Sequence, residues 1–125
     1  MTKEKENFDA ITPSIIFAQL FKSRNTMEIV HLKTESLSVY NTSKVYYETI
    51  TKLIIDLVKV NSGISGKKQI DDCPSSKYID PTLHLNDIHY YLSRHKTIFR
   101  TQEELNIIED ILRLISKTKV EITLQ

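Results

Sequence analysis

The stretch from His31 to Lys59 places the strongest constraint on how this chain can fold. It holds the end of one helix with an apolar stripe, a short run of turn-forming residues, and a second long stripe from about Tyr40 to Val60. Short connections join antiparallel neighbouring helices. The sequence therefore predicts an antiparallel pair of helices here, with Ser38 or Asn41 as the expected N-cap of the second helix.

Apolar residues at helical spacing define the first helix of this pair and indicate two further helices. Thr12-Pro13 starts the first, expected to end near Lys33, because threonine caps helices and proline fits their first position. A third stripe follows Pro81, and Thr101 with Glu104 forms a capping box before a fourth. The expected inward positions include Ile16, Leu20, Met27, Val30, Tyr46, Ile50, Leu53, Leu57, Leu85, Ile88, Leu92, Leu105, Ile108, Ile111, Leu112 and Ile115.

The second stripe is unusually wide, because Val45, Ile54, Ile55 and Val58 thicken it. A helix that is apolar over so wide an arc is buried on more than one side. This width favours an interface between subunits in addition to an internal core.

The connection between the second and third helices, residues 62–80, is much longer than the roughly 2–8 residues that antiparallel neighbours need. Extended at about 3.3 Å per residue, it could run the length of a bundle. Two interpretations remain open on length alone, a crossover along the bundle and a surface loop.

Composition indicates one helical domain at residues 12–125, preceded by a flexible N-terminal arm at residues 1–11. The net charge of +1 gives no overall field that would attract nucleic acid or an anionic membrane. No apolar run could span a bilayer, and the polar start lacks the apolar core of a signal peptide. A single cysteine, Cys73, forms no internal disulfide. We therefore expect a cytoplasmic protein that does not bind membranes.

Several segments resemble an uncharacterised family of small phage and large-virus proteins: residues 31–36, 44–48 and 106–112, with Ile115, Lys117-Thr118 and Thr123-Leu124. That family is similar to a trimmed form of the DNA-protecting starvation ferritins, the Dps type. The resemblance covers about residues 12–124 and is most specific in the last helix. It implies an all-α, ferritin-like four-helix bundle with a long crossover between helices two and three. It also implies a homo-oligomer assembled through the first two helices, in a host cell cytoplasm or a virion.

In Dps-type ferritins, a histidine near the end of the first helix and acids on the second helix of a neighbouring subunit hold iron. The resemblance places His31 at the histidine position, but Ile55 and Lys59 at the two acidic positions. Isoleucine cannot bind a metal, and lysine adds positive charge where negative charge is needed. The standard ferroxidase site is therefore expected to be absent. A vestigial metal site of His31 and Glu48 is one hypothesis, and a histidine that is simply hydrogen-bonded in the interior is the other.

The remaining candidates are weak. His84, His89 and His95 are five and six residues apart, which suits a metal poorly because helical pairs need a spacing of three or four. Acidic residues in the long connection lack the spacing of a calcium loop. Lysines there and in the N-terminal arm could meet DNA phosphates if an oligomer repeated them. These residues are Asp71, Asp72, Asp80, Lys67, Lys68, Lys77, Lys3 and Lys5.

These observations predict a non-catalytic bundle protein that self-assembles, needs no cofactor and has a structural or interaction role, plausible for a virus. Two alternatives stay open. One is a Dps-like iron-oxidising store with a rearranged metal site. The other is a nucleoid-type binder that protects DNA.

Overall fold

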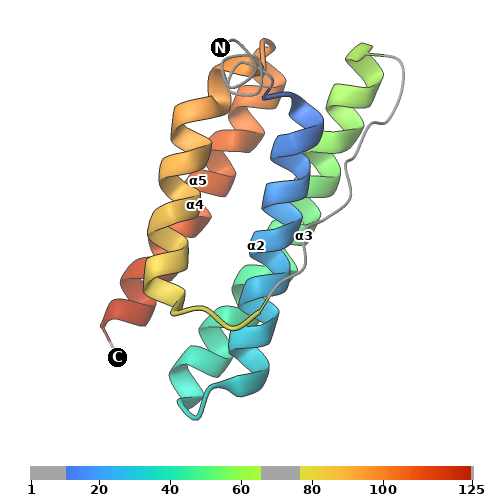
Figure 1. Ribbon diagram of the computed structural model, residues 1–125. Helices are drawn as coiled ribbons and strands as arrows, with labels where there is room; N and C mark the ends of the chain where they lie inside the picture. The colour runs from blue at the N-terminus through green and yellow to red at the C-terminus, as the bar shows by residue number, and fades with distance from the viewer. Residues whose placement is uncertain (1–10, 66–76, 125) are drawn as a thin grey trace, which may run out of the picture.

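Helices account for nearly all of the chain that the computed structural model describes, which is residues 11–65 and 77–124. Four α-helices and one 3-10 turn lie in these ranges (Figure 1): α2 (Pro13–Lys33), α3 (Leu37–Ser65), α4 (Pro81–His95), η1 (Lys96–Ile98) and α5 (Gln102–Thr123). The expected all-α class and the four helices are confirmed. The predicted arm at residues 1–11 lies, except for Ile11, outside the described residues.

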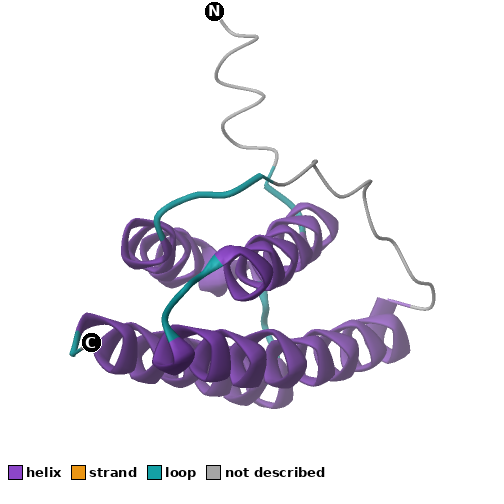
Figure 2. Ribbon diagram, turned by 90° about the horizontal axis from the view of Figure 1, so that it is seen from below, coloured by secondary structure: helices purple, strands orange, loops and turns teal. Residues whose placement is uncertain are grey.

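Each helix packs against two others, in the cyclic order α2, α3, α5 and α4. Figure 2 shows α2 and α4 in one layer and α3 and α5 in the other. α3 and α4 run in the same direction, and α2 and α5 run in the opposite one. The end of α3 and the start of α4 therefore lie at opposite ends of the bundle. The predicted crossover would have to join these two points, and its residues 66–76 lie outside the described part of the chain.

The interior is formed by the apolar stripes that the sequence indicates. Tyr46 is the largest of the fully buried side chains, and Phe17 and Phe99 pack with ring centroids 6.0 Å apart. Burying a side chain of this kind contributes about 1.5–3 kcal/mol. The buried stripe residues are Ile16, Leu20, Met27, Val30, Ile50, Leu57, Leu85, Ile88, Leu92, Ile108, Ile111, Leu112 and Ile115, whereas Leu53 and Leu105 are partly buried.

Polar caps fix where the helices begin. The Thr12 side chain accepts a hydrogen bond from the Ile15 amide at 3.4 Å, and the capping box of Thr101 and Glu104 is complete. Glu104 also accepts from the Asn61 side chain at 2.9 Å, which ties α5 to α3. Burial alone would raise the pKa of Glu104, but the hydrogen bonds from Asn61 and Thr101 outweigh it and lower the pKa.

The start of α3 differs from expectation. Ser36, rather than Ser38 or Asn41, caps this helix, because its hydroxyl accepts from the Val39 amide at 3.2 Å. The turn after α2 is thus shorter than predicted, and Ser38 and Asn41 lie inside the helix as exposed residues. At the other end of the chain α5 continues to Thr123, so residues 120–123 extend the last helix.

The wide stripe on α3 divides into two parts. Ile54 and Val58 are buried, whereas Val45 and Ile55 are 57% and 42% exposed. The core of the bundle therefore uses only one side of the stripe, and Val45 and Ile55 face outward. None of the helices in the described ranges is long and apolar enough to cross a membrane.

Candidate functional site

His31 lies near the end of α2 and is only 5% exposed. Its Nδ1 is 2.7 Å from the backbone oxygen of Tyr40. A carbonyl oxygen can only accept, so Nδ1 carries the proton and donates it. The imidazole stacks on the Tyr40 ring at 3.9 Å and meets the Tyr47 ring edge-on at 5.4 Å. The expectation of a hydrogen-bonded interior histidine is confirmed.

Glu48 occupies a different environment from His31. It lies on α3 directly after Tyr47, but its side chain is exposed, and no hydrogen bond joins it to the buried histidine. Among the described residues, no group of three or more His, Cys, Asp and Glu side chains is placed to hold a metal ion. The hypothesis of a metal site at His31 and Glu48 stays a prediction.

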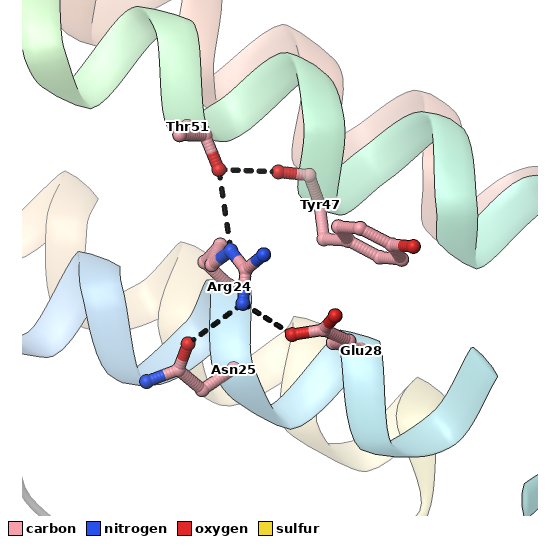
Figure 3. Close-up of polar contacts among 5 residues, drawn as sticks. All are labelled: Arg24, Asn25, Glu28, Tyr47 and Thr51. Carbon is pink, nitrogen blue, oxygen red and sulfur yellow. Dashed lines mark hydrogen bonds and ion pairs between the residues drawn. The ribbon is translucent and has the colours of Figure 1, made fainter. Parts of the chain in front are cut away.

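Arg24, two turns before His31, clamps α2 to α3 (Figure 3). Its Nε donates to the Thr51 hydroxyl at 3.3 Å, and one terminal nitrogen donates to Asn25 at 3.0 Å and forms an ion pair with Glu28. The guanidinium also lies 5.1 Å from the centroid of the Tyr47 ring. An arginine in this position gains from both hydrogen bonding and the electron-rich ring face.

Arg24, Tyr47, His31 and Tyr40 thus form a continuous series of contacts, which we call the α2–α3 seam. The residues alternate between the two helices and fill the edge of the bundle where those helices meet. The Arg24 guanidinium and His31 Nδ1 both bond to groups within the chain. Its chemistry suits rigid support of the helix pair rather than proton transfer.

A second polar cluster joins three helices. The Ser23 hydroxyl on α2 is 2.8 Å from the Tyr46 hydroxyl on α3 and 2.8 Å from His84 Nε2 on α4. Ser23 and Tyr46 are fully buried. We call these three residues the interhelical bridge. Its Ser23–His84 hydrogen bond links α2 to α4.

The protons of the bridge can be placed by counting donors. Within the described ranges, Ser23 is the one hydrogen-bond partner of the buried Tyr46 hydroxyl. Because a buried O–H group needs an acceptor, Tyr46 donates to Ser23. The Ser23 hydroxyl then donates its own proton to His84 Nε2. This order needs a neutral imidazole. Burial lowers the pKa of His84 from 6.5 to about 4, Asp87 nearby opposes this shift, and Lys22 adds to it. Burial also raises the pKa of Tyr46 well above its usual value.

A pocket of about 290 Å³ opens beside the bridge, between α2 and α4. His84 lines it, one or two turns before Asp87 and Tyr91 on the same face of α4. The Tyr91 hydroxyl is buried without a hydrogen-bond partner, and burial raises its pKa. The Tyr91 hydroxyl is therefore not exposed to the pocket in this structure. The pocket in this form offers His84 and Asp87 as polar groups on α4.

The three histidines of α4 have three different surroundings. His84 belongs to the interhelical bridge, His89 lies 3.5 Å from the Ser93 hydroxyl, and His95 packs on the Tyr91 ring at 4.8 Å. The interhelical bridge was not predicted. Its signal in the sequence is a serine, a tyrosine and a histidine within apolar stripes, but only the packing of three helices shows that they meet.

Several predicted candidates lie outside the described residues. They are Lys3, Lys5, Lys67, Lys68, Asp71, Asp72 and Cys73. Comparison with known proteins identifies no relative: no family model, no curated protein and no solved structure matches the chain.

Proposed function

We propose that this protein is a non-catalytic, ferritin-like bundle subunit related to the Dps type, which self-assembles through α2 and α3. Its role is structural or in protein interaction. We assign it to a virus because it resembles phage and large-virus proteins. The directions of the four helices support the ferritin-like part of the proposal, because α3 and α4 run parallel on either side of a long connection.

The observation that carries the proposal is the apolar surface on the first two helices. Leu32 and Leu37 are 72% and 74% exposed beside the turn that joins α2 to α3, and Val45 is 57% exposed on α3. Tyr40 and Ile55 add further exposed apolar area to α3. Apolar side chains gathered on one helix pair mark an interaction surface when a monomer leaves them uncovered.

The α2–α3 seam supports the same proposal. His31 and Arg24 are engaged by side chains and backbone of their own subunit, and these contacts hold the helix pair rigid. A rigid pair loses little conformational freedom on association, so more of the apolar contact appears as affinity. The buried histidine thus supports the shape of the interaction surface.

Sedimentation at micromolar concentration tests the proposal. We expect the wild-type protein to sediment as an oligomer, and we expect Val45→Glu to shift it toward the monomer, because the variant places charge within the contact. Leu83→Glu is the matched control, since Leu83 is a comparably exposed aliphatic residue, 56% exposed, on α4 rather than on the first two helices. A wild-type protein that remains monomeric at all micromolar concentrations would refute self-assembly.

Iron oxidation and DNA binding remain predictions, because no observation on the described residues favours either. An iron(II) oxidation assay with His31→Ala as the control tests the first. A gel shift at low and moderate salt tests the second.

A further inference from the structure

The outward side of α3 carries a repeating pattern of exposed side chains directly opposite the buried Ile50. With about 3.6 residues per turn, positions 48 and 52 lie near the centre of this side, and positions 45, 55, 44 and 56 flank them. All six are exposed. We call Lys44, Val45, Glu48, Lys52, Ile55 and Asp56 the α3 outer face.

The charges of the α3 outer face are not used within the subunit. Lys44, Glu48, Lys52 and Asp56 form no hydrogen bond or ion pair with the described part of the chain. Oppositely charged residues four positions apart on a helix, such as Glu48 and Lys52, often form an ion pair with each other. Here both side chains remain available to a partner.

The pattern is self-complementary when two copies of α3 lie antiparallel. A two-fold axis level with residue 50 sets position i of one helix opposite position 100 − i of the other. It sets Glu48 opposite the partner's Lys52, Lys44 opposite the partner's Asp56, and Val45 opposite the partner's Ile55. Each contact occurs twice, as an isologous interface requires. Opposite charges therefore meet opposite charges, and the two exposed aliphatic side chains meet each other.

We propose that the partner of α3 is a second copy of this chain, bound through the α3 outer face with the two helices antiparallel about residue 50. This inference rests on the self-assembly proposed above and specifies its geometry.

The charge order selects this register over its neighbours. An axis at residue 48 would set Lys44 opposite the partner's Lys52, and an axis at residue 52 would set Glu48 opposite the partner's Asp56. Both alternatives place like charges opposite one another. At close range, such pairs disfavour association by an amount on the order of several kcal/mol. The register at residue 50 is free of such pairs across the α3 outer face.

The ends of α3 fit the same axis. Leu37, 74% exposed, would face the partner's Gly63, a residue where an added Cβ would meet nothing within 4 Å. A large side chain therefore meets an open position at each end of the contact. The interface would extend along about 39 Å of helix, at 1.5 Å per residue from position 37 to position 63. Its centre is charged, so association should weaken as salt rises.

A charge-swap cycle, followed by sedimentation equilibrium of the full chain, tests the geometry. Lys52→Glu and Glu48→Lys each place two like-charged pairs at the centre, and we expect each to raise the dimer dissociation constant about tenfold or more, which corresponds to about 1.4 kcal/mol. The double variant Glu48→Lys/Lys52→Glu rebuilds both pairs with reversed polarity. It should return to within about threefold of the wild-type protein.

Arg94→Glu is the matched control, because Arg94 is an exposed cation on α4, the helix diagonally opposite α3. It should leave the dissociation constant unchanged, and circular dichroism checks that every variant keeps its helices. If the wild-type protein associates but Lys52→Glu associates equally well, the α3 geometry is wrong and self-assembly stands. The geometry also fails if both single variants disrupt the dimer and the double variant does not restore it. A monomeric wild-type protein overturns both proposals.

Discussion

The two sides of α2 are held in different ways. Toward α3, the α2–α3 seam joins Arg24 and His31 to two tyrosine rings and to a backbone oxygen. Toward α4, the interhelical bridge supplies one hydrogen bond, from Ser23 to His84, beside an open pocket. The α3 side is thus held by ring contacts and hydrogen bonds spread over several residues, and the α4 side has a buried polar cluster at one point.

The buried His31 and the partly buried His84 differ in their hydrogen-bond partners. His31 donates from Nδ1 to the backbone carbonyl oxygen of Tyr40. His84 accepts from a hydroxyl, so protonation would turn an acceptor into a donor and disrupt the order of the whole bridge. On the α4 side, the protonation of His84 is therefore coupled to the hydrogen bonds of the interhelical bridge.

The largest expected effect is on the interhelical bridge itself. Ser23→Ala would leave the Tyr46 hydroxyl and His84 Nε2 without their partner, at a cost of about 2–4 kcal/mol in the free energy of unfolding. Ser43→Ala is the matched control, because Ser43 is equally buried but bonds only to carbonyls of its own helix. That variant should lose less than about 1 kcal/mol. Urea unfolding at one fixed protein concentration measures both, and equal losses would contradict the comparison.

The second largest expected effect is a loss of stability in acid through protonation of His84 on α4. The folded pKa of His84, about 4, lies below its unfolded value of 6.5, so the unfolded chain binds more protons between these values. The contribution of His84 to the free energy of unfolding is therefore fully present above about pH 6.5 and is lost as the pH falls toward 4. The loss is at most about 3 kcal/mol. Solvent screening at the half-buried ring makes it smaller.

His84→Gln isolates this contribution, because glutamine can still bond Ser23 but does not titrate. Glu104 also loses stability in acid, since its folded pKa is lowered, and both proteins share that loss. The difference between the two unfolding free energies, measured from pH 7 to pH 4, should therefore report His84. A difference that stays constant over this range would show that His84 is not the group responsible.

The smallest effect is expected from the α2–α3 seam, where the contacts are shared among several residues. Arg24→Ala should lower the free energy of unfolding by about 1–2 kcal/mol through loss of the Thr51 bond and the Tyr47 ring contact. Arg113→Ala removes an exposed ion pair with Asp110 and should cost less than about 0.5 kcal/mol. Indistinguishable urea midpoints for the two variants would mean that the clamp adds no stability.

The helices were predictable wherever a local signal was strong. Thr12-Pro13 and the capping box at Thr101 act within four residues of chain, so the starts of α2 and α5 followed from the sequence. The start of α3 was misplaced because Ser36, Ser38 and Asn41 are all good caps, and local preference does not choose among them. Which face of the wide α3 stripe is buried also depended on the neighbours that α3 finds.

The candidate site was less predictable than the fold. An interior, hydrogen-bonded histidine was one of the two hypotheses for His31, but its tyrosine partners on another helix were not predicted. The interhelical bridge brings together residues 23, 46 and 84, and the sequence gives no sign of that meeting. Such clusters depend on the relative rotation of packed helices, which small changes in many apolar contacts decide.

By itself, the sequence determined four helices, most of their limits and the charge order along α3, because periodicity, caps and spacing act over a few residues. The tertiary structure alone decided that His31 is held by a carbonyl and two rings, that His84 is held by a hydroxyl, and that Val45 and Ile55 face outward. These outcomes depend on contacts between residues far apart in the chain, and packing geometry, rather than local propensity, sets those contacts.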